Sequence, residues 1–255
     1  MGESHVSYLI DMDGVLYRGS QALPGARRFM ERLARRDRTY MLVTNDSAYT
    51  REDIHARLQG IGIDVSVSAI YTSAMATAAW VRDHMAGQSV MLVGERGLHA
   101  AFQETGVETV QENPDCLVIG ELTQIDATAL SKAAAYASKG VQLIGTNPDL
   151  FVPSTKGARL GCGAIAAIFE KVAGKAATFI GKPDPRMFEY AMSILGVNRE
   201  NVVVIGDNMQ TDILGAERLG LQSILVLTGV SQVGDLESYS FCPTRVVRSL
   251  DEVEH

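Results

Sequence analysis

Two aspartates, Asp11 and Asp13, stand one residue apart at the end of an apolar run near the start of the chain. On an extended segment, residues i and i+2 face the same side, so both carboxylates can point in one direction. Gly14 would ease a sharp turn of the backbone after them. Two like charges about 4 Å apart repel by roughly 4 kcal/mol at an effective dielectric constant of 20. Alone, such a pair is most often a turn or a helix cap.

Later apolar runs also end in polar residues: Thr44 and Asn45, then Gly181 and Lys182, then Gly206 and Asp207, with Asp212 five residues further on. The carboxyl ends of parallel strands lie along one edge of an open sheet, and ligands bind in the crevice there. We therefore expect Asp11, Asp13, Asp207 and Asp212 to gather in one pocket with Lys182. Carboxylates crowded in this way need a cation to neutralise them.

The types of these side chains point to Mg²⁺ and a phosphoryl group. Carboxylate oxygens without histidine or cysteine favour Mg²⁺ over zinc, and Mg²⁺ held by carboxylates and water commonly accompanies a phosphate. Lys182 adds a fixed positive charge, while Thr44 and Asn45 add neutral hydrogen-bond donors. A cation, a lysine and a hydroxyl together indicate a site for phosphoryl chemistry.

The elements that must position these residues follow from the apolar pattern. Short runs rich in β-branched residues alternate with longer amphipathic stretches, which is typical of βα units on a parallel sheet. Helices are predicted in 24–37 and 125–140, with Pro24 at the start of the first and Asp126 as N-cap of the second. The predicted strands are 6–11, 39–45, 69–73, 89–95, 116–121, 141–147, 177–182, 202–207 and 223–229.

So many strands are more than one small sheet needs, and the polar strand ends meet at one edge only if the middle of the chain folds separately. We therefore predict a discontinuous α/β core formed by 1–73 and 179–255. Residues 74–178 are expected to form an inserted α/β cap domain.

Four motifs resemble, in order and spacing, those of the haloacid dehalogenase superfamily: DMDGV (11–15), TND (44–46), GKPDP (181–185) and GDNMQTD (206–212). The runs YTSAMATA, GTNPD and DNMQTDILGA are similar to its NagD-like subfamily of phosphatases, and the similarity extends over essentially the full chain. The resemblance implies a Rossmann-like parallel-sheet core with an α/β cap between the second and third motifs. Many relatives read Thr-Asn-Asn at the second motif, and Asp46 of this chain is therefore left outside the predicted site.

The resemblance also implies a role for each matching residue. Asp11 would be the nucleophile that forms an aspartyl-phosphate, and Asp13 would be the general acid and base. Mg²⁺ would be held by Asp11, the backbone carbonyl of Asp13 and Asp207, with Asp212 in or near its outer shell. The transferring phosphoryl oxygens would be held by Thr44, Asn45 and Lys182.

The expected activity is that of a Mg²⁺-dependent phosphomonoesterase acting on small phosphorylated metabolites. Similarity to the NagD-like group suggests nucleoside monophosphates such as UMP, with sugar phosphates, phosphoglycolate and the model substrate p-nitrophenyl phosphate as further candidates. Substrate choice should lie in the cap, where the segment 145–153 is expected over the pocket with Asn147 and Asp149 bonding a sugar or base. A turn built on Asn-Pro-Asp is an equally good interpretation of that segment.

Other functions fit the sequence less well. A signalling receiver domain shares the acidic pocket, the threonine, the lysine and Mg²⁺, but it is about half this length and lacks the cap. A phosphomutase on the same fold would move phosphate within a sugar and release little. A G-x-G-x-x-A pattern formed by Gly161, Gly163 and Ala166 matches a dinucleotide fingerprint, but no buried strand precedes it. We expect it to begin a helix in the cap.

The composition limits partners and location. The chain has 255 residues, 46% hydrophobic and 21% charged, and its net charge of -7 with no long basic run argues against nucleic-acid binding. Three scattered cysteines (Cys116, Cys162 and Cys242) favour a reducing compartment over a disulfide framework or a zinc site. No export signal is recognisable and no apolar run approaches the ~20 residues of a membrane span. We expect a cytoplasmic enzyme without membrane partners, and homo-oligomerisation stays open.

Overall fold

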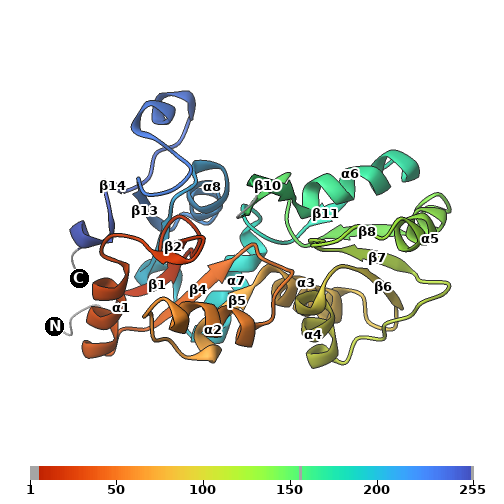
Figure 1. The fold of residues 1–255 in the computed structure, drawn as a ribbon, viewed down its shortest axis with the longest axis horizontal. Helices are drawn as coiled ribbons and strands as arrows, with labels where there is room; N and C mark the ends of the chain where they lie inside the picture. Colours follow the sequence, from red (N-terminus) through yellow and green to blue (C-terminus); the bar gives the residue numbers. More distant parts are fainter. Residues whose placement is uncertain (1–5, 155–156, 254–255) are drawn as a thin grey trace. The chain divides into compact units, whose positions relative to one another are not determined.

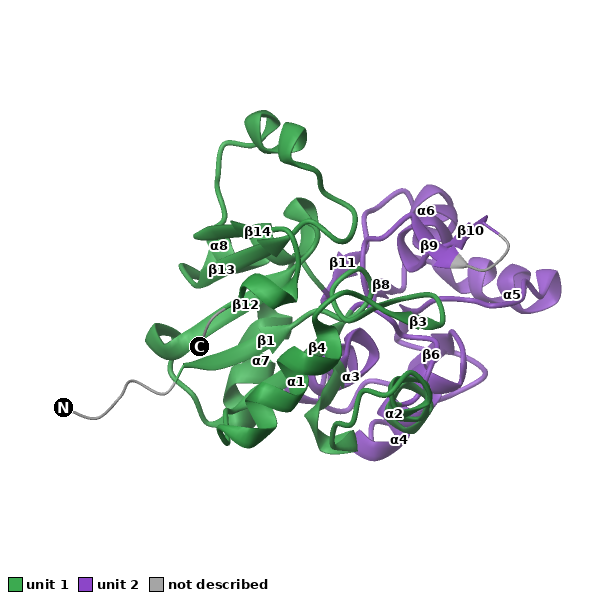
Figure 2. Cartoon of the chain, turned by 60° about the vertical axis from the view of Figure 1, so that its left-hand side comes forward, with its two compact units in different colours: residues 1–44, 51–71, 182–255 green, residues 45–50, 72–181 purple. Residues whose placement is uncertain are grey.

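The computed structural model describes residues 6–154 and 157–253. The chain divides into two compact units (Figure 2). The first comprises Met1–Thr44, Arg51–Tyr71 and Lys182–His255, and the second comprises Asn45–Thr50 and Thr72–Gly181. The predicted boundaries lay at 73/74 and 178/179, whereas the units meet at 71/72 and 181/182, and residues 45–50 join the second unit as well.

A six-stranded sheet forms the centre of the first unit. Its order is β14 (Arg245–Val247), β13 (Gln222–Val226), β12 (Val202–Gly206), β1 (Ser7–Ile10), β4 (Tyr40–Thr44) and β5 (Ile70–Thr72). Figure 2 shows β13, β12, β1 and β4 running side by side, and β1 pairs in parallel with both β12 and β4. Every residue of β1 and β12 is buried, which explains why their sequences are continuous apolar runs without alternation.

The helices of the first unit are α1 (Ala26–Arg35), α2 (Arg51–Gly60), α7 (Pro185–Leu195) and α8 (Leu214–Leu219). Shorter helical turns are η1 (Val67–Ala69), η2 (Arg199–Asn201), η3 (Met209–Ile213), η4 (Val233–Ser238) and η5 (Leu250–Glu252). The α1 helix buries Ala26, Phe29, Met30 and Leu33, which lie at the spacing of one helix face. A short antiparallel hairpin, β2 (Tyr17–Arg18) with β3 (Gln21–Ala22), follows the first strand closely.

The second unit has its own parallel sheet. Its order is β11 (Thr178–Phe179), β8 (Gln142–Gly145), β7 (Cys116–Ile119) and β6 (Val90–Val93), beside an antiparallel hairpin of β9 (Phe151–Ser154) and β10 (Gly157–Leu160). The helices are α3 (Ser73–His84), α4 (Arg96–Thr105), α5 (Ala127–Ala137) and α6 (Cys162–Ala173). Figure 1 shows α5 and α6 on one face of this sheet, with α3 and α4 on the other.

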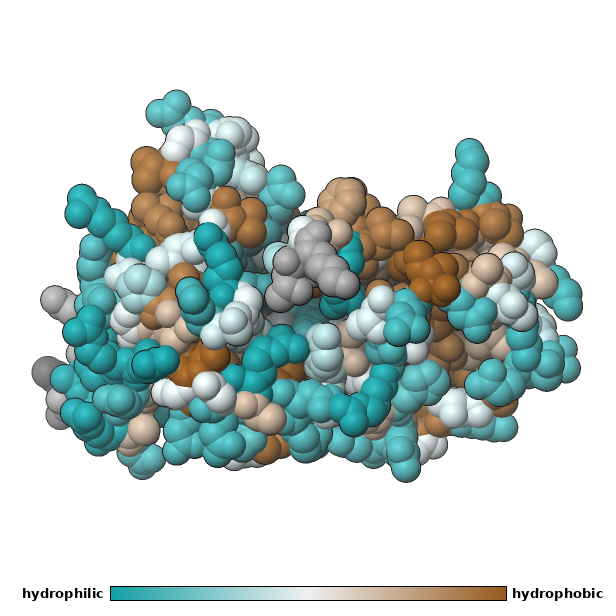
Figure 3. Space-filling model, in the orientation of Figure 1, coloured by the Kyte–Doolittle hydropathy of each residue, from teal (hydrophilic) through white to brown (hydrophobic). Residues whose placement is uncertain are grey.

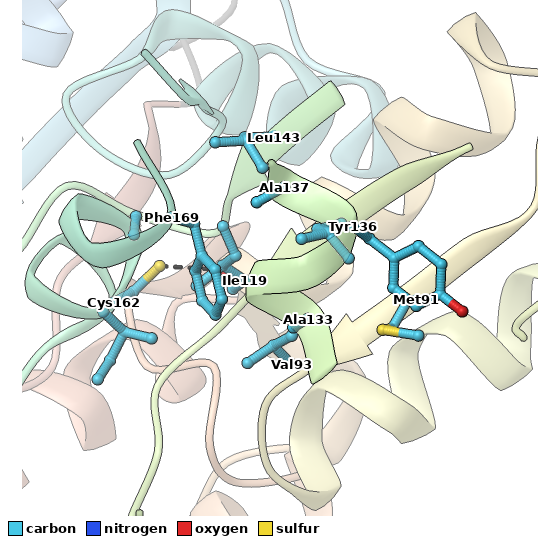
Figure 4. Close-up of a cluster of buried hydrophobic side chains, with 12 residues drawn as sticks. Met91, Val93, Ile119, Ala133, Tyr136, Ala137, Leu143, Cys162 and Phe169 are labelled. Atoms are coloured by element: carbon cyan, nitrogen blue, oxygen red, sulfur yellow. Dashed lines mark hydrogen bonds between the residues drawn. The ribbon is translucent and has the colours of Figure 1, made fainter. Parts of the chain in front are cut away.

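Side chains of α5 and α6 pack on the sheet in a core cluster (Figure 4). Phe169 and Ile165 of α6 and Ala133 of α5 meet Ile119 and Leu143 of the sheet. The opposite face of α6 is apolar too: Ile168 and Val172 are exposed, and Figure 3 shows such side chains gathered over this helix and the nearby hairpin.

The structure confirms the α/β class and all nine predicted strands, but it corrects the position of one of them. The strand predicted at 177–182 is reduced to β11, which pairs with β8 in the sheet of the second unit. Lys182 therefore does not end a strand of the six-stranded sheet and instead begins the segment that returns to the first unit. In the described part of the chain, no helix has the length and apolar character to cross a bilayer.

Candidate active site

The register of the central strands brings two predicted residues together. Ile10 of β1 pairs with Ile205 of β12, so Asp11 and Asp207 follow neighbouring strand ends. The Asp11 backbone N–H donates to the Ile205 carbonyl at 2.8 Å, which extends the pairing to the aspartate itself. On the other side, Ile10 pairs with Leu42 of β4, and Thr44 ends that strand as a buried residue.

Asp212 reaches the same strand ends from η3, a π-helical turn after β12. Its Oδ2 accepts hydrogen bonds from the Asn208 backbone N–H at 3.3 Å and the Thr211 hydroxyl at 3.1 Å. A Cβ at Gly206 would lie 2.2 Å from the Cβ of Asp212, so glycine at the end of β12 is what permits this close approach. The local fold thus returns a second carboxylate to the end of β12.

Lys182 lies buried among the acidic residues of the first unit. Its ammonium donates to Asp212 Oδ1 at 2.7 Å, to the Val43 carbonyl at 3.2 Å and to Asp11 Oδ1. The cis peptide between Lys182 and Pro183 follows directly. The sequence therefore placed Lys182 correctly beside the carboxylates, although the strand assumed to carry it there belongs to the other sheet.

Three carboxylates form a candidate metal site: Asp11, Asp207 and Asp212 each offer an oxygen, and these oxygens lie within 4.8 Å of one another. All the donors are hard oxygens, which suits Mg²⁺. Asp11 and Asp212 pair with the single ammonium of Lys182, and Asp207 lies in the same cluster. A divalent cation would balance the negative charge that remains. The residues present therefore fit a bound divalent ion.

The electrostatics of the cluster reflect this crowding. Burial raises the pKa of Asp11 well above its ordinary value, against the opposing charge of Lys182. Burial, and then the charge of Asp212, raise the pKa of Asp207 to about 7. Burial alone would lower the pKa of Lys182, but the charges of Asp11 and Asp212 outweigh it and raise that pKa. Without a further cation, the negative charge of the cluster is therefore energetically unfavourable in the folded protein.

Asp13 is not one of the three clustered carboxylates. It is partly exposed and forms an isolated bridge with Tyr17 at the start of the β2–β3 hairpin. Its predicted part in metal binding involved the backbone carbonyl rather than the side chain, and that assignment stays a prediction.

Asn45 belongs to the second unit and joins the two predicted cap residues there. The Asn45 side-chain amide donates to Asp149 Oδ2 at 2.8 Å, and the Asn147 amide donates to the Asn45 carbonyl at 2.7 Å. Asn147 Oδ1 also accepts the Asp149 backbone N–H at 3.1 Å, and Asn147 is fully buried. Asn147 therefore holds the Asn-Pro-Asp turn, while contact of Asn147 or Asp149 with a substrate stays a prediction.

Asp46 serves its own loop. Its Oδ1 accepts the backbone N–H groups of Ala48 at 2.9 Å and Tyr49 at 3.2 Å. The next residue, Ser47, accepts the Glu121 backbone N–H at 2.9 Å, which helps to explain why residues 45–50 group with the second unit. Asp46 therefore caps the loop in which it lies.

Sequence reasoning missed the loop after β13, residues 227–231 (LTGVS), which we call the LTGVS loop. Its Val230 backbone N–H donates to Asp207 Oδ2 at 2.7 Å. The predicted strand 223–229 ends at the same sheet edge. Because ligands bind at the carboxyl ends of parallel strands, the sequence did give a reason to examine this loop. The signal was weak because the loop acts through its backbone and carries no carboxylate or lysine.

Comparisons with known proteins agree with this geometry. A family model described as haloacid dehalogenase-like hydrolase matches residues 8–108, and a second HAD-type hydrolase model matches residues 179–253. A dihydroxyacetone phosphatase of Corynebacterium glutamicum is 35% identical over 249 residues, covering 98% of this chain and 90% of the relative. The ribonucleotide monophosphatase NagD of Escherichia coli is 35% identical over 246 residues, covering 96% and 97%.

Solved structures match over the same extent. NagD from Escherichia coli K-12 superposes with a TM-score of 0.91 at 34% identity, covering 97% of this chain and 98% of that one. A double mutant of a thermostable NPPase from Geobacillus stearothermophilus has a TM-score of 0.91 at 36% identity, covering 98% of each chain. The similarity thus includes both units of the chain.

Proposed function

Because this chain belongs to the haloacid dehalogenase-like hydrolases and is a phosphatase, we propose that it is a Mg²⁺-dependent phosphomonoesterase that acts through an aspartyl-phosphate on Asp11. The observation that carries the proposal is the convergence of Asp11, Asp207 and Asp212 around the buried Lys182 ammonium. Such a group combines a nucleophile, a cation site and a fixed positive charge at one edge of a parallel sheet.

The chemistry of the first half-reaction belongs to Asp11 and Asp13. A carboxylate oxygen of Asp11 attacks phosphorus, the bond to the leaving oxygen breaks, and the proton of Asp13 passes to the leaving alkoxide. The phosphoryl group is then bonded to Asp11. The contact with Lys182 opposes the effect of burial, which raises the pKa of Asp11, and in this way it supports the ionised, nucleophilic form.

The second half-reaction regenerates the enzyme. Asp13, now ionised, takes a proton from a water molecule whose oxygen attacks phosphorus, and the bond between phosphorus and Asp11 breaks. Inorganic phosphate leaves, and Asp13 is again protonated. The partial exposure of Asp13 suits a group that must exchange a proton with an alkoxide and with water.

The remaining residues orient the phosphoryl group and the metal. Asp11, Asp207 and the carbonyl of Asp13 would hold Mg²⁺, with Asp212 in or near its outer shell. When bound, the ion would neutralise charge on the phosphoryl oxygens. The phosphoryl oxygens themselves would be held by Thr44, Asn45 and Lys182.

We propose small phosphorylated metabolites as substrates. The names of the relatives support this class: they include a dihydroxyacetone phosphatase, a ribonucleotide monophosphatase and an acid sugar phosphatase of Staphylococcus aureus. Nucleoside monophosphates such as UMP and sugar phosphates are therefore the first compounds to test. We also propose a cytoplasmic location, which is supported by three cysteines that stand as free thiols.

The test is a phosphate-release screen over nucleoside monophosphates, sugar phosphates, phosphoglycolate and p-nitrophenyl phosphate, with Mg²⁺ and with EDTA in its place. We expect release with Mg²⁺ and its loss with EDTA. No release from any compound would overturn the phosphomonoesterase proposal. A phosphorylated protein that persists without turnover would favour a receiver, and transfer within a sugar would favour a phosphomutase.

A further inference from the structure

The LTGVS loop holds Asp207 at its side chain and at its backbone. Val230 donates its N–H to Asp207 Oδ2 at 2.7 Å, and the Ser231 N–H donates to the Asp207 carbonyl at 3.0 Å. The Ser231 hydroxyl in turn accepts the Met209 N–H at 3.0 Å, at the start of η3. With Oδ2 engaged by Val230, the rotation of the Asp207 carboxylate is fixed, and so is the direction of Oδ1.

Two glycines press against the same carboxylate from two segments of the first unit. A Cβ at Gly229 would lie 1.7 Å from Asp207 Oδ2, and a Cβ at Gly14 would lie 2.3 Å from it. Gly14 also has a positive φ of 80°, which only glycine adopts readily. The loop that follows Asp11 and the LTGVS loop are therefore both packed on Asp207 too closely for a methyl group.

Two side chains, those of Thr228 and Arg18, fasten these segments to each other through three hydrogen bonds. The Thr228 hydroxyl donates to the Gly14 carbonyl at 2.6 Å. The Arg18 guanidinium, on β2, donates to the Thr228 carbonyl at 2.7 Å and to the Gly229 carbonyl at 3.4 Å. Neither side chain belongs to the cluster of Asp11, Asp207 and Asp212. Their bonds link the two segments that carry these glycines.

We infer that Thr228 and Arg18 are positioning residues for the divalent cation, because they hold the Gly14 and LTGVS loops closed on the Asp207 carboxylate. The inference rests on the proposed function, since it takes the three-aspartate cluster to be a cation site. Loss of either side chain loosens the hold of these two segments on Asp207. The Asp207 carboxylate can then leave the orientation that suits the ion. Cation affinity is then the property that changes first, while the chemistry at saturating cation is largely retained.

The expected size differs between the two residues. Groups that orient a metal ligand change metal affinity by about 10- to 100-fold when they are removed, and we expect this range for Thr228→Val. Arg18 is exposed, so its hydrogen bonds to the loop are worth less, and we expect a smaller weakening, of about two- to tenfold, for Arg18→Met. Thr228→Ser keeps the hydroxyl and should bind the cation like the wild type.

The experiment titrates Mn²⁺ into the full-length, metal-free protein and follows free Mn²⁺ by electron paramagnetic resonance, with Mg²⁺ as competitor. The same variants are assayed with p-nitrophenyl phosphate to separate the Mg²⁺ concentration at half-maximal rate from kcat and from KM at saturating Mg²⁺. Thermal unfolding of the metal-free variants checks the fold. The matched control is Arg28→Met, which removes another exposed arginine of the first unit that pairs only with Asp251 among the bonds described for it.

We expect weaker Mn²⁺ binding and a higher Mg²⁺ requirement in Thr228→Val and Arg18→Met, with kcat at saturating Mg²⁺ within a few-fold of the wild type. Unchanged Mn²⁺ affinity in both variants would overturn the inference while leaving the proposed function intact. If the wild type itself bound no Mn²⁺ and released no phosphate, the proposed function would fail and the inference with it. If Thr228→Val did not fold, the Mn²⁺ affinity of Arg18→Met, compared with that of Arg28→Met, would still decide whether the inference holds.

Discussion

Asp11 carries the proposed covalent step, and its replacement tests that step directly. Asp11→Asn keeps the size of the side chain but removes the nucleophilic carboxylate, while Lys182 keeps its bond to Asp212. We expect phosphate release to fall by more than about a thousandfold, as when other hydrolases lose their nucleophile. Phosphate release is measured at saturating Mg²⁺, and circular dichroism confirms the fold. Activity near the wild-type level would remove the aspartyl-phosphate from the mechanism.

Glu121 is a second buried charge, and it lies outside the proposed chemistry. It is 2% exposed and bonds Arg159 at 2.7 Å. Burial and the charge of Asp46 outweigh Arg159, and with Asp149 they raise the pKa of Glu121 to about 8 from its ordinary value of 4.5. The folded protein thus holds this proton more tightly than the unfolded chain. The contribution of the protonated Glu121 to the stability of the fold is fully present below pH 4.5, and it is lost as the pH rises through about 8.

Glu121→Gln keeps a hydrogen-bond acceptor for Arg159 but cannot ionise. We expect the wild type to lose stability relative to this variant between pH 5 and 8, by at most about 1.4 kcal/mol per pH unit. Urea unfolding at several pH values measures the difference. Parallel pH profiles for the two proteins would show that Glu121 titrates outside this window.

At the scale of the element, α6 offers a matched pair of neighbouring residues. Phe169 is fully buried in the core cluster of the second unit, whereas Ile168 is 44% exposed. We expect Phe169→Ala to lower the free energy of unfolding by about 3–5 kcal/mol, because it leaves a cavity. Ile168→Ala should stay within about 0.5 kcal/mol of the wild type. Urea denaturation measures both, and equal effects would contradict the assigned orientation of the helix.

Sequence reasoning found the elements whose signal is local. The buried strands β1 and β12 were recognisable from their apolar runs, and α5 from the Asp126 N-cap, whose side chain accepts from Thr128 and Ala129. Family resemblance supplied the proposed roles of Asp11, Lys182 and Asp207. The motifs therefore identified residues of the cluster even though the strand predicted to carry Lys182 belongs to the other sheet.

What the sequence did not reveal depends on pairing between distant segments. The hairpins β2–β3 and β9–β10 have strands of two to four residues, too short to display a period of two. Nothing in the sequence of β11 shows that Phe179 pairs with Gly145 rather than with a strand of the larger sheet. The loop around Gly229 was missed for a related reason, since its contact with Asp207 is made by the backbone.

At the scale of the whole molecule, the chain passes between its two units four times, yet the residues around the proposed cation belong to one unit. Asp11, Lys182, Asp207 and Asp212 all lie in the first. A ligand that binds only the folded state stabilises what it binds, by about 2.7 kcal/mol at 100 times its dissociation constant. The stabilisation by Mg²⁺ should therefore be concentrated in the first unit.

Hydrogen exchange followed by mass spectrometry can locate that stabilisation. With Mg²⁺ at 100 times its dissociation constant, we expect amides of β1 and β12 that exchange only on unfolding to slow by about a hundredfold. Amides of β6 and α5 should change far less, because the second unit contributes no carboxylate to the cluster of three. Asp207→Asn is the control and should remove the effect. Equal slowing in both units would mean that they unfold as one cooperative body, whatever their separate cores.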